Sequence, residues 1–196
     1  MSARKTWACP PKREQRWDVV GAGANAVDYV YRLPAPPHAD SPTAKLRISS
    51  HRVTGGGQMA TALSACTALG LRAAYVGAIG TDDNGRRIQQ ELAGRGIDLS
   101  HVVTRDATNQ FAVITVDETT GERIVLWDRD ERLMLRPADV PAGLIASARL
   151  VHVDDVDEVA AIRAATLARE AGVPVTSDLD RVTDRTPELV AAVSIP

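Results

Sequence analysis

Three consecutive glycines, Gly55 to Gly57, constrain the fold of this chain more than any other feature, because they directly precede the apolar segment 58–69. Glycine has no Cβ, so its backbone amides are unshielded and positive φ angles cost it little. Such a turn at the start of a helix leaves backbone N–H groups open to a ligand. The sequence therefore predicts a buried helix over 58–69 whose N-terminus lies where a ligand can contact the backbone.

Predicted strands and helices alternate on both sides of this turn. Short apolar runs predict buried strands at 17–21, 73–77, 149–153 and 173–177. Helical spacing of apolar residues predicts two amphipathic helices, 85–93 with Ile88 and Leu92 on one face, and 156–171 with Val159, Ile162 and Leu167. Strands that alternate with helices are typical of a parallel sheet, so the fold class is α/β.

Two parts of the chain interrupt this alternation with β-rich sequence. Residues 26–33 read as an extended segment that prolines terminate, and 45–53 alternate polar and apolar residues as a half-exposed strand does. The runs 110–116 and 123–127 flank 117–121, which has the composition of a hairpin turn. These segments predict an antiparallel β insertion beside the parallel sheet.

The spacing of glycines and aspartates resembles the first signature of the ribokinase-like (PfkB) carbohydrate kinases. In that family a Gly-Gly pair opens a helix, one glycine follows the helix, and a strand leads to another glycine and an Asp-Asp-x-Gly turn. The matching positions are Gly56, Gly57, Gly70, Gly80, Asp82, Asp83 and Gly85, followed by Leu92 and Gly96-Ile97-Asp98. The resemblance implies a ribokinase-like three-layer α/β/α sandwich, incomplete here, with a small β-sheet lid formed by segments near 26–53 and 110–128.

The same resemblance assigns sugar-binding roles to four residues. Asp28 matches the aspartate that accepts hydrogen bonds from substrate hydroxyls, a task for which a carboxylate has several acceptor sites; the alternative is a solvated acid at a strand end. Gly56 and Gly57 match the hinge where backbone amides meet the sugar, and the alternative is a plain turn before a helix. Thr61 stands where the family has an asparagine. Ala26 replaces the asparagine of ribokinase, which puts ribose in doubt as the substrate.

Two further likenesses bear on the sugar. The form Gly-Gly-Gly-x-x-Ala-Thr-Ala at 55–62 is similar to that of a subgroup that includes sulfofructose kinase. Gly56-Gly57 together with segment 123–129 is also similar to the ketohexokinase members of the family. Both likenesses imply a keto-sugar or a derivative of one.

Acidic residues follow two of the predicted parallel strands. Asp154 ends one strand, and Asp178 and Asp180 lie at the end of the next. Open α/β sheets bind ligands outside the carboxyl ends of their strands. The resemblance implies ATP and Mg²⁺ as cofactors and gives Asp154 and Asp180 as residues that organise metal and phosphate, whereas the alternative is ordinary loop capping.

The resemblance also implies what this chain lacks. The general base and the anion hole of the family belong to a second signature, Asp-Thr-x-Gly-Ala-Gly-Asp, and residues 1–196 hold no counterpart. We therefore expect residues 17–196 to be the N-terminal portion of an ATP-dependent sugar kinase, with no catalytic residue of its own and inactive alone. The alternative is a non-catalytic sugar-binding or dimerisation module, or a truncated remnant.

A dinucleotide-binding oxidoreductase is the rival from another class, because 21–26 fits Gly-x-Gly-x-x-Ala after a strand. That motif requires a helix directly after it, and 27–33 is short, β-branched and aromatic. Other classes fit poorly. The net charge of −2 does not favour binding to the negatively charged backbone of a nucleic acid, and no apolar run is long enough to cross a membrane.

The remaining features indicate a cytoplasmic protein with a small-molecule partner. Cys9 and Cys66 form no disulfide framework, and the basic segment 1–16 lacks the apolar region of a secretory signal, so we interpret it as a disordered leader. The resemblance implies a sugar or sugar derivative as the partner and allows a homodimer through the β lid.

We expect the isolated chain to aggregate or to be marginally stable, because half a sandwich exposes a sheet edge and apolar helix faces. Size-exclusion chromatography and thermal unfolding check this. A soluble monomer that melts cooperatively would contradict it.

Overall fold

The computed structural model describes residues 16–37 and 45–195, and the leader expected over 1–16 lies outside this part except for Arg16. The centre is a four-stranded sheet of β1 (Trp17–Ala22), β4 (Ala73–Val76), β9 (Ala148–Asp154) and β10 (Val175–Asp178). Its order is β10-β9-β1-β4, and every pairing is parallel. The predicted parallel α/β sheet is confirmed.

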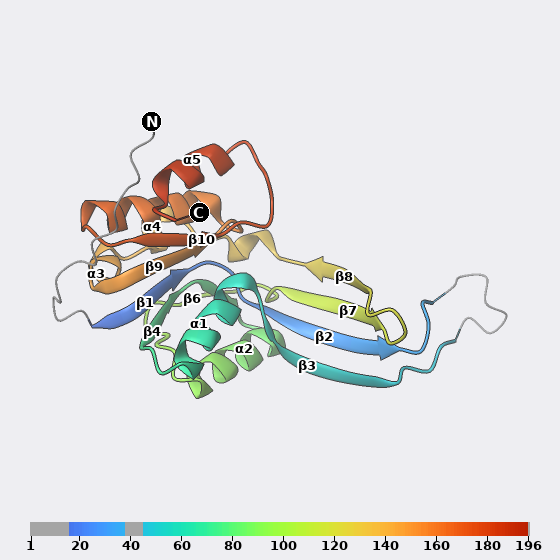
Figure 1. Cartoon of the computed structure of the whole chain (residues 1–196). Helices are drawn as coiled ribbons and strands as arrows, with labels where there is room; N and C mark the ends of the chain where they lie inside the picture. Colours follow the sequence, from blue (N-terminus) through green and yellow to red (C-terminus); the bar gives the residue numbers. More distant parts are fainter. Residues whose placement is uncertain (1–15, 38–44, 196) are drawn as a thin grey trace.

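Helices cover both faces of this core sheet, which gives three layers (Figure 1). On one side lie α3 (Ala142–Ala146), α4 (Glu158–Glu170) and α5 (Thr186–Ala192), and on the other α1 (Gln58–Ala68) and α2 (Asp83–Gly94). Side chains of a strand alternate between faces. Val20 accordingly packs in the cluster with α4, whereas Val19 packs with Met59 and Ile88 from α1 and α2.

A second four-stranded sheet, here called the outer sheet, extends away from the core (Figure 1). It contains β2 (Ala26–Leu33), β3 (Ser50–Gly56), β7 (Phe111–Asp117) and β8 (Arg123–Asp128) in the order β3-β2-β7-β8. β3 runs antiparallel to β2, and β8 runs antiparallel to β7, as predicted. The central pair is parallel instead, because β2 and β7 both leave the core in the same direction.

Several short elements escaped the sequence analysis. β5 (Ala78–Gly80) and β6 (Val103–Arg105) form a small parallel pair, and two 3-10 turns, η1 (Glu131–Leu133) and η2 (Pro137–Asp139), precede α3. α3 and α5 were also not predicted, and neither is longer than seven residues. Elements this short have too little periodicity to stand out from a loop.

The predicted boundaries need two corrections around the glycines. β3 begins at Ser50 rather than at residue 45, and it continues through Gly55 and Gly56. Only Gly57, with φ of 90°, turns the chain and becomes the N-cap of α1. The helix itself is buried on one face only, through Met59, Ala60 and Leu63, while Leu69 after its end is 81% exposed.

The predicted core face of α4 is correct only in part: Leu167 is buried and Ile162 packs partly buried against the core, but Val159 does not. The buried positions are chiefly alanines, namely Ala160, Ala161, Ala164, Ala165, Leu167 and Ala168. Val159, expected inside, is 46% exposed. Small side chains allow the helix backbone to lie close to the sheet, so at this interface the volume of a side chain decides more than its hydrophobicity.

We expect Ala164→Leu to destabilise the fold by about 1–3 kcal/mol, because a larger side chain overpacks a completely buried position. Val159→Leu is the matched control on the exposed face, and it should leave the free energy of unfolding nearly unchanged. Urea denaturation of both variants measures this. Equal effects of the two substitutions would argue against the packing of α4 described above.

Candidate functional site

Asp28 and Gly56 lie against each other where the outer sheet joins the core. A Cβ added to Gly56 would come within 2.1 Å of Oδ2 of Asp28, so only glycine leaves room for this carboxylate. Val27 and Tyr29 pack toward α2, so Asp28 faces the opposite side of the sheet. Partial burial raises the pKa of the Asp28 carboxyl. The structure thus brings together two of the four predicted sugar-binding residues.

Gly57 continues this junction into α1. Its φ of 90° is a conformation that favours glycine, and an added Cβ would lie 2.6 Å from Cα of Asn25. Within the described part of the chain, no side chain caps the N-terminus of α1. The third predicted residue therefore lies beside the second, next to N–H groups that no side chain caps.

Thr61 lies elsewhere. It is exposed on α1 and lines a small cleft between α1 and α2 together with Ser64, Glu91 and Arg95. Gly55 lines the same cleft, and its N–H donates to Oε2 of Glu91 at 2.8 Å. Thr61 is thus on the α2 side of β3, whereas Asp28 is on the other side.

Asp154 is completely buried at the end of β9. Its Oδ2 accepts a hydrogen bond from Ala24 N at 2.7 Å, and its Oδ1 accepts one from Val156 N at 3.1 Å. A Cβ on Gly23 would come within 2.1 Å of Oδ2, so glycine again makes space for a carboxylate. Burial raises the pKa of Asp154 to about 6, against the two N–H donors, which lower it.

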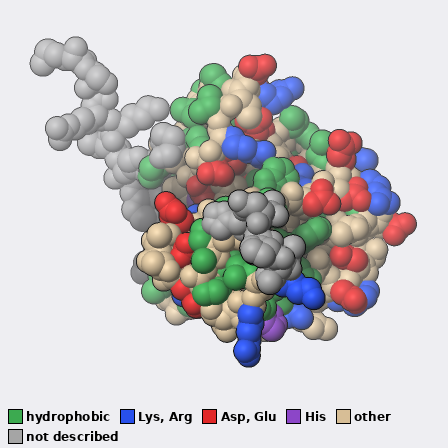
Figure 2. Space-filling model, turned by 90° about the vertical axis from the view of Figure 1, so that its right-hand side faces the viewer, with side chains coloured by type: hydrophobic (Ala, Val, Ile, Leu, Met, Phe, Trp, Pro, Cys, Tyr) green, Lys and Arg blue, Asp and Glu red, His purple; other side chains and the backbone are tan. Residues whose placement is uncertain are grey.

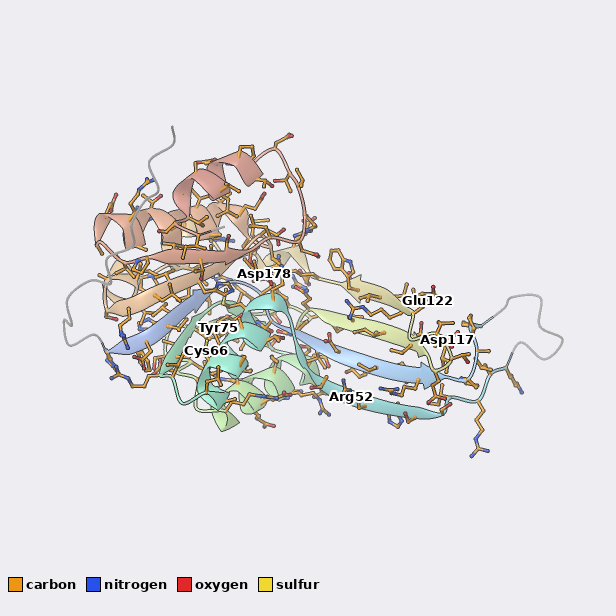
Figure 3. All side chains as sticks on the ribbon, viewed as in Figure 1. Arg52, Cys66, Tyr75, Asp117, Glu122 and Asp178 are labelled. Carbon is orange, nitrogen blue, oxygen red and sulfur yellow. The ribbon has the colours of Figure 1, made fainter. Side chains whose placement is uncertain are left out.

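Asp178 is the last residue of β10, an edge strand of the core sheet, and Asp180 follows two residues later; both are exposed (Figure 3 labels Asp178). The backbone N–H of Asp180 donates to Oδ2 of the buried Asp155 at 2.9 Å. Among residues 16–37 and 45–195, no group of three or more histidine, cysteine, aspartate or glutamate side chains could hold a metal ion. Metal or phosphate organisation by Asp154 and Asp180 stays a prediction.

The loop 21–26 does not have the geometry of a dinucleotide site. It leads from β1 directly into β2, so the helix whose N-terminus would hold a pyrophosphate does not follow it. Residues 16–37 and 45–195 also contain no helix long and apolar enough to cross a membrane. The structure therefore argues against the dinucleotide-binding alternative. The two sheets and the Asp28–Gly56 contact are consistent with the sugar-kinase interpretation.

The sequence of residues 19–195 matches the pfkB family of carbohydrate kinases. This chain belongs to the pfkB family. Two relatives illustrate the substrates for which members of this family are named. An ATP-dependent ribose-1-phosphate kinase of Halopiger xanaduensis is 30% identical over 83% of the chain and 54% of the relative. A nucleoside kinase of Methanothermobacter thermautotrophicus is 28% identical over 82% of the chain and 51% of the relative.

Solved structures give the same fold for this pfkB chain. A ribokinase of Arabidopsis thaliana, determined with ribose and ATP, superposes with a TM-score of 0.72 at 19% identity, over 90% of the chain and 58% of the ribokinase. The ribokinase-like fold is therefore confirmed. The chain spans about half the length of the relatives that it matches.

Sequence reasoning missed polar residues that hold the junction together. Asn25, Asn109 and Asp157 are buried, and each bonds across long sequence separations. Asp157 pairs with Arg129, which follows β8, at 2.7 Å. The sequence held one indication of two of these residues, because one asparagine precedes β2 and another precedes β7.

Asp154 should give a distinctive pH dependence of stability. Its pKa in the folded chain, about 6, lies above the value of about 3.9 expected for an unfolded chain, so the folded state binds more protons between these values. The contribution of this carboxyl to the stability of the folded chain is therefore fully present below about pH 4 and is lost as the pH rises through about 6. Asp154→Asn removes the titration.

We compare the unfolding free energy of Asp154→Asn with that of the natural chain at each pH. From pH 4 to pH 7 we expect this difference to change in favour of Asp154→Asn by on the order of 2–3 kcal/mol. Urea denaturation at several pH values measures the difference. Asp18 provides the contrast, because Arg72 and Arg149 lower its pKa to about 2 and its contribution is lost only as the pH falls. A constant difference for Asp154→Asn would contradict the raised pKa.

Proposed function

We propose that the protein containing this chain transfers phosphate from ATP to a hydroxyl group of a small sugar or sugar derivative. Residues 17–196 supply its sugar-binding portion, and the outer sheet acts as the lid over the sugar. The observation that carries the proposal is the Asp28 carboxylate, partly buried over Gly56 at the sheet junction. Family membership and the relatives named as sugar kinases support it.

The chemistry of Asp28 suits a sugar hydroxyl. Burial is the cause of its raised pKa, and among the described residues no group donates a hydrogen bond to its side chain. A carboxylate that has lost part of its hydration gains most from a ligand that donates hydrogen bonds. Two neighbouring hydroxyls of a sugar are such donors, and the backbone at Gly57 offers further contacts to the same ligand.

The class of sugar is a finer part of the proposal. The relatives include kinases named for ribose 1-phosphate, nucleosides and fructose, so phosphorylation of a pentose or hexose derivative is within the range of the family. The glycine-rich form at 55–62 favours a keto-sugar within that range. Thr61 would contribute only if the cleft between α1 and α2 opens toward the sugar.

ATP with Mg²⁺ would supply the transferred phosphoryl group and neutralise its charge. The described residues do not form a site for Mg²⁺ by themselves, since they contain no suitable group of ligands and both oxygens of Asp154 already accept backbone N–H groups. Asp180, which is exposed, is the better candidate to organise metal or phosphate. We place the protein in the cytoplasm.

The outer sheet also supports a proposed homodimer. Figure 2 looks onto the molecule from the side toward which this sheet extends, and hydrophobic side chains lie at the surface among charged ones. Large apolar residues of β8 are exposed, namely Ile124, Val125, Leu126 and Trp127. Exposed apolar strands are sites of association, so pairing through β8 is expected whether or not the chain is catalytic.

In a protein that carries both halves of the kinase, Asp28→Asn should lower kcat/KM roughly 10- to 100-fold, the cost of losing a charged hydrogen-bond partner of the sugar. The assay follows ATP consumption with D-fructose, D-ribose, ribose 1-phosphate and adenosine as acceptors. Glu122→Gln, at the far end of the outer sheet (Figure 3), is the control and should have no effect.

Unchanged kcat/KM in Asp28→Asn would remove Asp28 from the sugar site. Calorimetry of the 196-residue chain with the same compounds separates the alternatives. Binding that Asp28→Asn abolishes supports a sugar-binding portion. The absence of both binding and turnover would favour the remnant.

A further inference from the structure

A buried network of side chains connects the two sheets. Asn25 is 4% exposed, Asn109 is 1% exposed and Tyr75 is completely buried. Nδ2 of Asn25 donates to Oη of Tyr75 at 2.9 Å and to the carbonyl of Ala78 at 2.7 Å. Nδ2 of Asn109 donates to Oδ1 of Asn25 at 3.0 Å, which joins the two amides.

The network has no vacant donor. Oδ1 of Asn109 accepts from Gly80 N at 3.0 Å, and its Nδ2 also donates to the carbonyl of Gln110 at 3.1 Å. The hydroxyl of Tyr75 donates to the carbonyl of Gly23 at 2.8 Å. Buried amides are stable only when their polar atoms are paired, and a fully paired network fixes one arrangement of the segments it joins.

The segments that this network joins are the ends of the outer-sheet strands nearest the core. Asn25 directly precedes β2, and Asn109 lies two residues before β7. These strands then run side by side from Val27 and Phe111 onward. Gly57, which directly follows β3, packs against the backbone of Asn25. Three of the four strands of the outer sheet therefore meet the core at this amide pair.

The partners on the core side belong to regular strands and a helix cap. Tyr75 belongs to β4 of the core sheet, and the carbonyl of Ala78 and the N–H of Gly80 belong to β5. Asp82, the N-cap of α2, accepts the backbone N–H of Asn109 through Oδ1 at 3.0 Å. The fourth strand, β8, is held separately, because Arg129 after it pairs with Asp157 at the start of α4.

We propose that the Asn25–Asn109 amide pair sets the angle between the outer sheet and the core, and that both residues are positioning residues for Asp28. Asp28 is three residues beyond Asn25 on β2, so a change of this angle moves its carboxylate relative to the carboxyl edge of the core sheet. This role of the amide pair does not depend on which substrate the protein binds.

The test measures the distance between the two sheets directly. Nitroxide labels are placed at Arg52→Cys in β3, a strand that meets the core at the amide pair, and at Val159→Cys in α4, both at exposed positions, in a chain in which Cys9 and Cys66 are replaced by serine. Pulsed electron resonance reports the distribution of distances, with the labelled chain diluted into unlabelled chain so that only distances within one molecule count. The parent chain should give one narrow maximum.

Asn109→Ala should broaden this maximum or add a second one, because Oδ1 of Asn25 and the N–H of Gly80 lose their partner. Tyr75→Phe removes a single hydroxyl without changing the shape of the ring. It should also broaden the distribution of distances. This second variant keeps the test decisive if Asn109→Ala does not fold.

Ile145→Ala is the matched control, because Ile145 is completely buried in the cluster around α4, away from the outer sheet. It should lower the melting temperature while the distribution stays narrow. If Asn109→Ala and Tyr75→Phe also lower the melting temperature and keep a narrow distribution, the network is only structural and the proposal is overturned. The measurement uses no sugar, so its outcome is independent of the test of Asp28.

Discussion

Close approach of a carboxylate to a glycine Cα is the constraint on which the junction of this pfkB chain depends. It occurs at Gly23 with Asp154 and at Gly56 with Asp28. Any side chain at either glycine would occupy the space of a carboxylate oxygen, so neither carboxylate could stay where it lies. The first contact fixes the exit of the chain from the core sheet, and the second places an acid on the outer sheet.

The two carboxylates differ in how their burial is compensated. Asp154 accepts two backbone N–H groups, which offset part of the cost of removing it from water. Asp28 has no such donor among the described residues, and burial is the one cause of its raised pKa. The two N–H donors hold the Asp154 carboxyl in place although burial still raises its pKa to about 6, whereas an acid without donors at a partly exposed junction has a hydrogen-bonding capacity that a ligand can use. We therefore favour Asp28 over Asp154 as the residue that binds a ligand.

Much of the architecture could be predicted from local sequence. Alternating strands and helices gave the parallel core sheet, and the spacing of Ile88 and Leu92 gave the buried face of α2, because an amphipathic pattern there is unambiguous. On α4 the same reasoning placed Leu167 correctly but not Val159, and it missed the buried alanines, since alanine carries little hydrophobic contrast. Of the candidate site, Asp28, Gly56 and Gly57 were found through a family motif, and the structure does not group Thr61 with them.

The amide network could not be predicted because it depends on pairs far apart in sequence. Asn25 and Asn109 are 84 positions apart, and Asp154 and Ala24 are 130 apart. No local pattern reveals that two asparagines will share one buried hydrogen bond, since each alone has the composition of an ordinary turn residue. Hydrogen bonds within each sheet are satisfied whatever the angle between the sheets, so contacts between the sheets must set that angle. Apolar packing of Val27 and Tyr29 against α2 is one such contact, and the buried amides add directional hydrogen bonds that packing alone lacks. These polar groups are the least visible in the sequence.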